Sequence, residues 1–137
     1  MREEIKKLIP QREPFLFVDR IIEKNETKIL TGLKLTGDED FFRGHFPGNP
    51  VMPGVLLQEA IFQTGALLMS SQDGAGLGVV TRVQNAKFKS MVLPGDELIM
   101  EVELTEKLAN ASYMKGKTTV AGKTVLVIEF AVASIEA

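Results

Sequence analysis

The sequence predicts a single α+β domain over residues 1–137, in which one long helix packs on a curved antiparallel sheet. Two observations support this prediction. One segment near the middle of the chain has the composition of a buried helix, and the segments on either side of it alternate as strands do. The 137 residues are 45% hydrophobic, which is enough to close one core, and no linker or repeat divides them.

The elements expected before the long helix are a short helical turn and a hairpin. Residues 5–9 predict a helical turn that Pro10 ends. Residues 15–22 form a β-type run, and residues 27–36 alternate with a period of two, which indicates a half-buried strand. Asn25 offers a turn between the two runs, so they make a hairpin.

A stiff loop and the long helix occupy the middle of the chain. Residues 44–54 hold three prolines and three glycines, so no regular element fits there. Pro53 suits the start of a helix, where its missing N–H costs nothing. Residues 55–71 are rich in good helix formers, and residues 74–76 are expected to end the helix. Close approach of another backbone or of a ligand would explain Gly65 in mid-helix.

Strands dominate the rest of the chain, and they are predicted at residues 77–88, 97–105, 112–120 and 125–135. Turns are expected at residues 94–96 and 122–123, so three or four of these strands should follow one another as a meander. The last strand is apolar on both faces, which is typical of a central strand.

Composition excludes several classes of function. Sixteen basic and eighteen acidic residues give a net charge of −2, so the chain lacks the excess of positive charge that is typical of nucleic-acid-binding proteins. The lack of cysteine excludes disulfides and a cysteine nucleophile, and one histidine excludes a multi-histidine site, so no metal is expected. The first residues do not form a secretory signal and no stretch is long enough to span a membrane, which predicts a cytoplasmic protein.

A narrow polar line on the predicted helix indicates a site. At about 100° per residue, Glu59, Gln63 and Ser70 fall within about 40° of one another, among large apolar residues. A surface helix has a much wider polar face, so this line is expected to face a confined cavity or a subunit interface. The alternative is a narrow solvent-exposed strip. A carboxyl among leucines would have a raised pKa and could act as a general acid.

His45 stands in the stiff loop just before the helix. Neighbouring prolines would hold its imidazole in place, and histidine is the side-chain type whose ordinary pKa lies between about 5 and 8. A neutral imidazole can take a proton from the carbon beside a thioester carbonyl, while N–H groups near Gly54 and Val55 bind the enolate oxygen. A protonated Glu59 can then donate to a departing β-hydroxyl, which removes water. The alternative is a structural histidine bonded to a loop carbonyl.

The segment GHFPGNPVMPGVLLQEAIFQ, residues 44–63, closely resembles the signature of (3R)-hydroxyacyl-acyl-carrier-protein dehydratases of the FabZ type. PFLFVDRI and AKFKSMVLPGDEL, residues 14–21 and 86–98, are further matches, so the resemblance spans nearly the whole chain. It implies a hot-dog fold, in which a curved sheet wraps a long central helix. It also implies a lyase of fatty acid biosynthesis that forms trans-2-enoyl thioesters on acyl carrier protein without a cofactor.

The resemblance implies a role for each candidate residue. His45 corresponds to the base, or its partner in proton exchange, and Glu59 to the helix carboxylate. The amide of Gly54, beside Val55, would hold the thioester carbonyl, and Gln63 would orient the carboxylate. Members of the family form homodimers with shared sites, in which His45 of one subunit faces Glu59 of the other, and some are trimers of dimers.

The chain departs from the family pattern at a few positions. Gln11 begins the segment that often reads HRYPFLLVDR in the family, and Met91 replaces a usual proline. Val79 and Val80 stand where many members have a tyrosine that, in some of them, gates the acyl tunnel.

Other interpretations stay open at this point. Arg82, Lys87 and Lys89 could form a basic edge that docks an acidic carrier protein with its phosphopantetheine arm, or simply a solvated strand face. Glu59 could activate water in an acyl thioesterase. The chain could also be a non-catalytic homologue that binds the acyl carrier protein.

Overall fold

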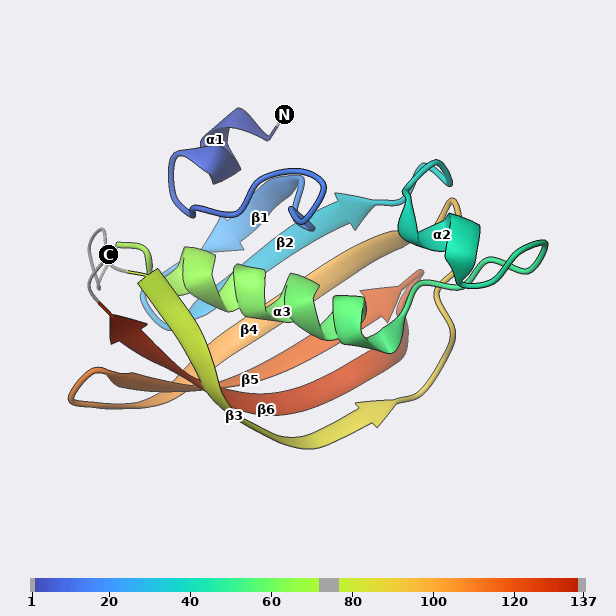
Figure 1. The fold of residues 1–137 in the computed structure, drawn as a ribbon. Coiled ribbons are helices and arrows are strands. Elements are labelled where there is room, and N and C mark those ends of the chain that lie inside the picture. The colour runs from blue at the N-terminus through green and yellow to red at the C-terminus, as the bar shows by residue number, and fades with distance from the viewer. Residues whose placement is uncertain (1, 72–76, 136–137) are drawn as a thin grey trace.

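The computed structural model describes residues 2–71 and 77–135. Its strands form one six-stranded antiparallel sheet, and the long helix α3, Gly54–Met69, packs against one face of that sheet (Figure 1). Two four-residue helices, α1 (Glu3–Lys6) and α2 (Phe41–Gly44), lie outside this pair of layers. The predicted α+β architecture is confirmed, and α2 was not predicted.

The strand order is β1-β2-β4-β5-β6-β3. In that order the strands are Arg20–Lys24, Lys28–Lys34, Glu97–Leu108, Ala111–Val120, Lys123–Ile135 and Leu77–Phe88. The predicted meander of three or four strands is confirmed for three of them, β4, β5 and β6, while β3 pairs with β6 at the edge of the sheet. β4 lies between β2 and β5, so the chain passes β6 and β5 on its way from β3 at the edge to β4.

The first strand is shorter than predicted. Residues 15–19 precede β1 as irregular backbone, because the N–H of Phe17 donates to the side chain of Gln63 rather than to a neighbouring strand. The turn at Asn25 is confirmed, since its Oδ1 accepts the N–H groups of Thr27 and Lys28 at 2.9 and 3.0 Å. Such a bond from a side chain to the following backbone is typical of asparagine in turns.

The long helix begins and ends close to the predicted positions. It starts at Gly54, directly after Pro53, and its last residue is Met69 rather than residue 71. The expected stop at residues 74–76 lies outside the described residues. Positive φ angles of 89° at Gly95 and 80° at Gly122 mark the two predicted turns between strands.

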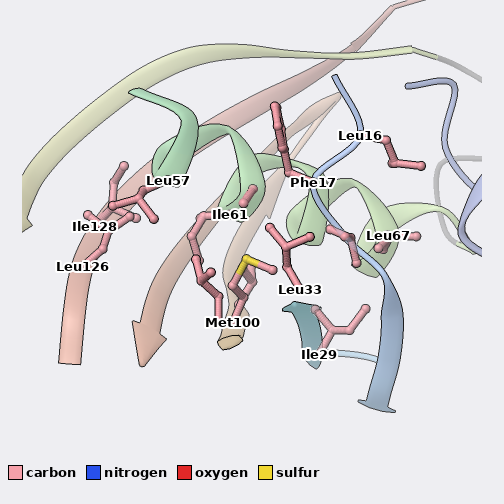
Figure 2. Packing of buried hydrophobic residues seen from close by; sticks show 14 of the residues in the cluster. Leu16, Phe17, Ile29, Leu33, Leu57, Ile61, Leu67, Met100, Leu126 and Ile128 are labelled. Carbon is pink, nitrogen blue, oxygen red and sulfur yellow. The ribbon is translucent and has the colours of Figure 1, made fainter. Parts of the chain in front are cut away.

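The core lies between α3 and the sheet (Figure 2). Leu57, Ile61 and Leu67 of the helix are buried against side chains from the strands, which include Ile29, Leu33, Met100, Leu126 and Ile128. Fully burying one such side chain contributes about 1.5–3 kcal/mol, so this layer holds the helix in place.

Two glycines allow the helix to lie close to the sheet. A Cβ at Gly116 of β5 would lie 2.7 Å from Cγ2 of Ile61, and one at Gly65 would lie 3.1 Å from both Sδ of Met114 and Cζ of Phe130. The close neighbours of Gly65 are therefore sheet side chains, which corrects the expectation of an approaching backbone. These contacts set the distance between α3 and the sheet, and with it the position of the polar line on the helix.

Candidate active site

The start of α3 presents free backbone N–H groups. Gly54 and Val55 are its first two residues, and N–H groups in the first turn of a helix have no partner within that helix. They lie at the positive end of the helix dipole, which favours an anion. A Cβ at Gly54 would lie 3.0 Å from Cε1 of Phe88, so only glycine lets this ring of β3 reach the helix start.

Glu59 is held from one side by Gln63, one turn further along α3. Oε1 of Gln63 accepts the N–H of Phe17 at 2.8 Å, which fixes which way the amide points. Its Nε2 then donates to the carbonyl of Phe15 at 2.8 Å and to Oε2 of Glu59 at 3.0 Å. Gln63 is 0% exposed, so the proposed solvent-exposed strip is wrong for this residue.

This network decides where Glu59 carries a proton. Oε2 accepts a hydrogen bond from Gln63, so a proton on this carboxyl belongs on Oε1. Burial of the half-buried Glu59 raises its pKa, and the hydrogen bond from Gln63 lowers it by a smaller amount. The pKa of Glu59 therefore lies above its ordinary value, as a general acid requires.

Gln63→Leu is expected to destabilise the fold by about 2 kcal/mol or more, because it leaves the buried N–H of Phe17 and carbonyl of Phe15 without their partner. Urea unfolding measures the change. Gln58→Leu, a similar change at a half-buried position of the same helix, is the control and should stay within about 1 kcal/mol of wild type. Equal losses of unfolding free energy in the two variants would show that the hydrogen bonds of Gln63 do not stabilise the fold.

The imidazole of His45 has a defined tautomer. Its Nδ1 lies 2.8 Å from the carbonyl oxygen of Val51, and a carbonyl only accepts, so Nδ1 is the donor. In the neutral ring Nε2 then carries no proton and can receive one. The N–H of Val51 donates to the carbonyl of His45 at 2.8 Å, and the ring of Phe46 stacks on the imidazole at 4.0 Å. The ring is therefore bonded to a loop carbonyl, as the structural alternative expected, and this bond leaves Nε2 able to accept a proton.

A cavity of about 420 Å³ lies beside Glu59. One wall is the polar line of α3, including Glu59 and Ser70. The other walls are mostly apolar or small residues of the N-terminal segment and of β3, β5 and β6, among them Leu8, Gly78, Val80, Met114 and Val132, together with the polar Gln11. Glu59 and Ser70 of the predicted polar line therefore face a cavity, whereas Gln63 of the same line bonds to the backbone of Phe15 and Phe17.

Within one described chain, the side chains of His45 and Glu59 are not bonded to each other. Among the described residues, the side chain of His45 bonds to Val51 and that of Glu59 to Gln63. The loop that carries His45 projects beyond the N-terminal end of α3 (Figure 1). His45 therefore belongs to the projecting loop, whereas Glu59 lies in the wall of the cavity.

Strand β3 is exposed along nearly its whole length. Among the described strands it lies at the edge and pairs with β6 alone, and its residues Val79, Val80, Val83 and Phe88 are 40–48% exposed. Val55 at the helix start is 70% exposed. Large apolar side chains at an unpaired edge are unusual for an isolated subunit.

Within residues 2–71 and 77–135, no group of three or more histidine and acidic side chains could hold a metal ion. None of the helices in this described part of the chain has both the length and the apolar character to cross a membrane.

Solved structures share this architecture. The chain superimposes on a subunit of the dehydratase heterocomplex ApeI:P from Xenorhabdus doucetiae with a TM-score of 0.85 at 12% identity, covering 96% of this chain and 91% of that one. The PaaI protein of Escherichia coli matches with a TM-score of 0.68 at 17% identity, covering 82% and 80%. The fold defines a hot-dog protein, as the resemblance in sequence implied.

Sequence comparison identifies which family of hot-dog proteins the chain resembles. The FabA-like domain family matches residues 9–129. The 3-hydroxyacyl-acyl-carrier-protein dehydratase FabZ of Petrotoga mobilis is 45% identical over 119 residues, which cover 86% of both chains. The same enzyme of Bacillus subtilis is 44% identical over 130 residues, 93% of this chain and 92% of that one. This chain belongs to the FabZ family of 3-hydroxyacyl-acyl-carrier-protein dehydratases.

Proposed function

We propose that this protein removes water from (3R)-3-hydroxyacyl thioesters on acyl carrier protein and forms the trans-2-enoyl thioesters of fatty acid biosynthesis. Membership of the FabZ family supports this activity. The structural observation that carries it is the position of Glu59 in the wall of a cavity, where burial raises its pKa and Gln63 donates a hydrogen bond to one of its carboxyl oxygens.

The proposed mechanism uses one base and one acid. Nε2 of His45 takes the proton from the carbon beside the thioester carbonyl, and the electron pair forms the enolate. The N–H groups of Gly54 and Val55 bind the enolate oxygen, where one such donor typically contributes about 2.7–4 kcal/mol. The electrons then form the double bond, the β-carbon–oxygen bond breaks, and Glu59 protonates the departing hydroxyl, which leaves as water.

We infer that two subunits build each site together. The exposed apolar side chains of β3 and Val55 would be covered by a second copy of the chain. The projecting loop would then bring His45 of one subunit to the cavity of its partner, opposite Glu59. A homodimer of this kind gives two identical sites, and three dimers could associate further.

A set of cations on β3 supports docking of an acidic carrier protein. A bulge between Gln84 and Lys87 shifts the register, so that Arg82 pairs with Ala131 and Lys87 with Val127. Ala131 and Val127 are four residues apart on β6, which places both cations on one face of the sheet. Lys89 lies just after the end of β3, and all three cations are exposed.

Lys87→Glu is expected to lower kcat/KM for carrier-bound substrate about tenfold and to leave the N-acetylcysteamine thioester unaffected, because only the former presents an acidic protein. The effect should shrink in high salt. Lys7→Glu makes the same charge change beside α1, at the opposite edge of the sheet, and should change neither substrate. Equal losses with both substrates would argue against docking at β3.

The activity itself is tested in the hydration direction. Crotonyl and longer enoyl thioesters lose their conjugated absorbance when water adds, and the product is the 3-hydroxyacyl thioester. Release of free thiol would instead identify a thioesterase, in which Glu59 activates water. Tight binding of acyl carrier protein with neither reaction, at any chain length, would identify a non-catalytic homologue.

A further inference from the structure

We propose that Ala66 of α3 determines how long an acyl chain the protein accepts, because its small side chain keeps open the cavity that leads away from Glu59. This inference rests on the proposed dehydration. It adds to that function a residue that selects among acyl substrates without taking part in the reaction.

The cavity beside Glu59 extends along α3. The helix residues in its wall run from Glu59 to Ser70, which are eleven positions apart, so the two lie about 16 Å from each other along the helix axis. Beyond Glu59 the walls include the large apolar side chains of Leu77, Met114 and Val132. An apolar chain attached to a carbon that reacts beside Glu59 therefore has a path toward Ser70.

Ala66 lies in the middle of the helix face that lines this path. At about 100° per residue, Phe62 and Met69 lie on one side of Ala66, within about 60° of it. Glu59 and Ser70 lie on its other side, within about 40°. Ala66 is also half-buried, although the residues before and after it are buried. Its methyl group is therefore the part of the helix wall that faces the cavity at this level.

The position of Ala66 separates short substrates from long ones. Ala66 follows Glu59 by seven residues, which is about 10 Å along the helix axis. In a four-carbon substrate only one carbon follows the β-carbon, so the chain ends well before Ala66. A long chain has to pass Ala66, and a larger side chain at this position would block long chains alone.

The walls on the far side of Ala66 are anchored. Nζ of Lys24 donates to the carbonyl of Leu67 at 2.8 Å, and Oγ of Ser70 donates to the same carbonyl at 2.7 Å. This carbonyl is in the last turn of the helix, where it has no partner within the helix itself. Gly78 and Ser134, which also line the cavity, are paired with each other across β3 and β6. The cavity therefore has fixed dimensions, as selection by chain length requires.

A second cavity, of about 480 Å³, does not offer such a path. It lies between the N-terminal segment, β2 and the first turn of α3, where Leu56 contributes to its wall. Among the described residues that line it, Glu59 does not occur. A tail in this second cavity would not continue from a carbon that reacts beside Glu59, so the cavity serves as the comparison for the test.

The test measures hydration of four-carbon and twelve-carbon enoyl thioesters of N-acetylcysteamine. We expect Ala66→Leu to lower kcat/KM for the twelve-carbon substrate at least about tenfold, because excluding even one methylene group from a pocket has an effect of about this size. For the four-carbon substrate kcat/KM should stay within about twofold of wild type. Ala66→Ser, which keeps the size of the side chain, should preserve the wild-type ratio of the two values.

Leu56→Phe is the matched control, because it adds bulk to the second cavity instead. It should leave the ratio of the two kcat/KM values unchanged. Circular dichroism checks that each variant is folded. If Ala66→Leu does not fold, Ala66→Val makes a smaller increase in size and should shift the ratio in the same direction.

Three results would overturn the inference. Equal losses for both substrates in folded Ala66→Leu or Ala66→Val would show that residue 66 affects the reacting groups rather than the tail. Unchanged hydration of the twelve-carbon substrate would show that the tail does not pass Ala66. A selective loss of that substrate in Leu56→Phe would place the tail in the second cavity. Lack of hydration of either substrate by the wild-type protein would instead refute the proposed function, so the two failures are distinguishable.

Discussion

His45→Ala is expected to lower dehydration turnover by at least about 100-fold, because it removes the only imidazole of the chain and with it the base for the α-proton. The carbonyl of Val51 holds Nδ1 and leaves Nε2 to act. Because the ring does not bind the acyl chain in this mechanism, kcat should fall much more than KM rises. Steady-state assays with a short enoyl thioester, run in the hydration direction, measure both parameters.

A matched variant separates loss of the base from disturbance of its loop. Phe46→Leu removes the ring stacked on the imidazole but keeps the bond between His45 and Val51. It should retain far more turnover than His45→Ala. Wild-type turnover in a folded His45→Ala protein would exclude His45 as the base.

Glu59→Gln is expected to cause a loss of similar size, at least about 100-fold, because an amide has no acidic proton for the departing hydroxyl. The substitution preserves shape, and the new amide oxygen can still accept from Nε2 of Gln63, so the hydrogen-bond network need not change. Circular dichroism and urea unfolding check that the fold is retained. Unchanged turnover in the folded variant would refute the assignment of Glu59.

The pH dependence gives Glu59→Gln a second readout. Burial raises the pKa of Glu59, so its protonated, active form persists above the pH at which an exposed glutamate ionises. Turnover of the wild type should therefore fall as pH rises through this raised pKa, and the residual turnover of Glu59→Gln should lack that decline. Stability has the same sign, because ionisation of a carboxyl with a raised folded pKa destabilises the folded state as pH rises.

Mixing the two inactive variants tests whether sites are shared between subunits. In a heterodimer of His45→Ala and Glu59→Gln, one site receives both damaged side chains and the other receives both intact ones. Random exchange makes about half of the dimers mixed, so about one quarter of the wild-type activity should return. No recovery after verified subunit exchange would place each site within one chain.

Local sequence determined most of the elements. The glycine- and proline-rich residues 44–54 predicted the loop before the helix, and Pro53 predicted where the helix starts, because both depend on backbone restrictions of single residues. Asn25 and Gly95 marked turns for the same reason. The helical spacing also predicted a polar line, of which Glu59 and Ser70 face a cavity.

Only the tertiary structure decided how distant segments meet. Alternation along residues 77–88 predicts a strand but not its partner, so the pairing of β3 with β6 followed from packing of the whole sheet. Phe15 and Phe17 left the predicted strand because their backbone groups bond to Gln63, 46 residues beyond Phe17. Hydrogen bonds and cavities between remote residues exist only once the chain has closed its core, whereas turns and helix starts are fixed by neighbouring residues.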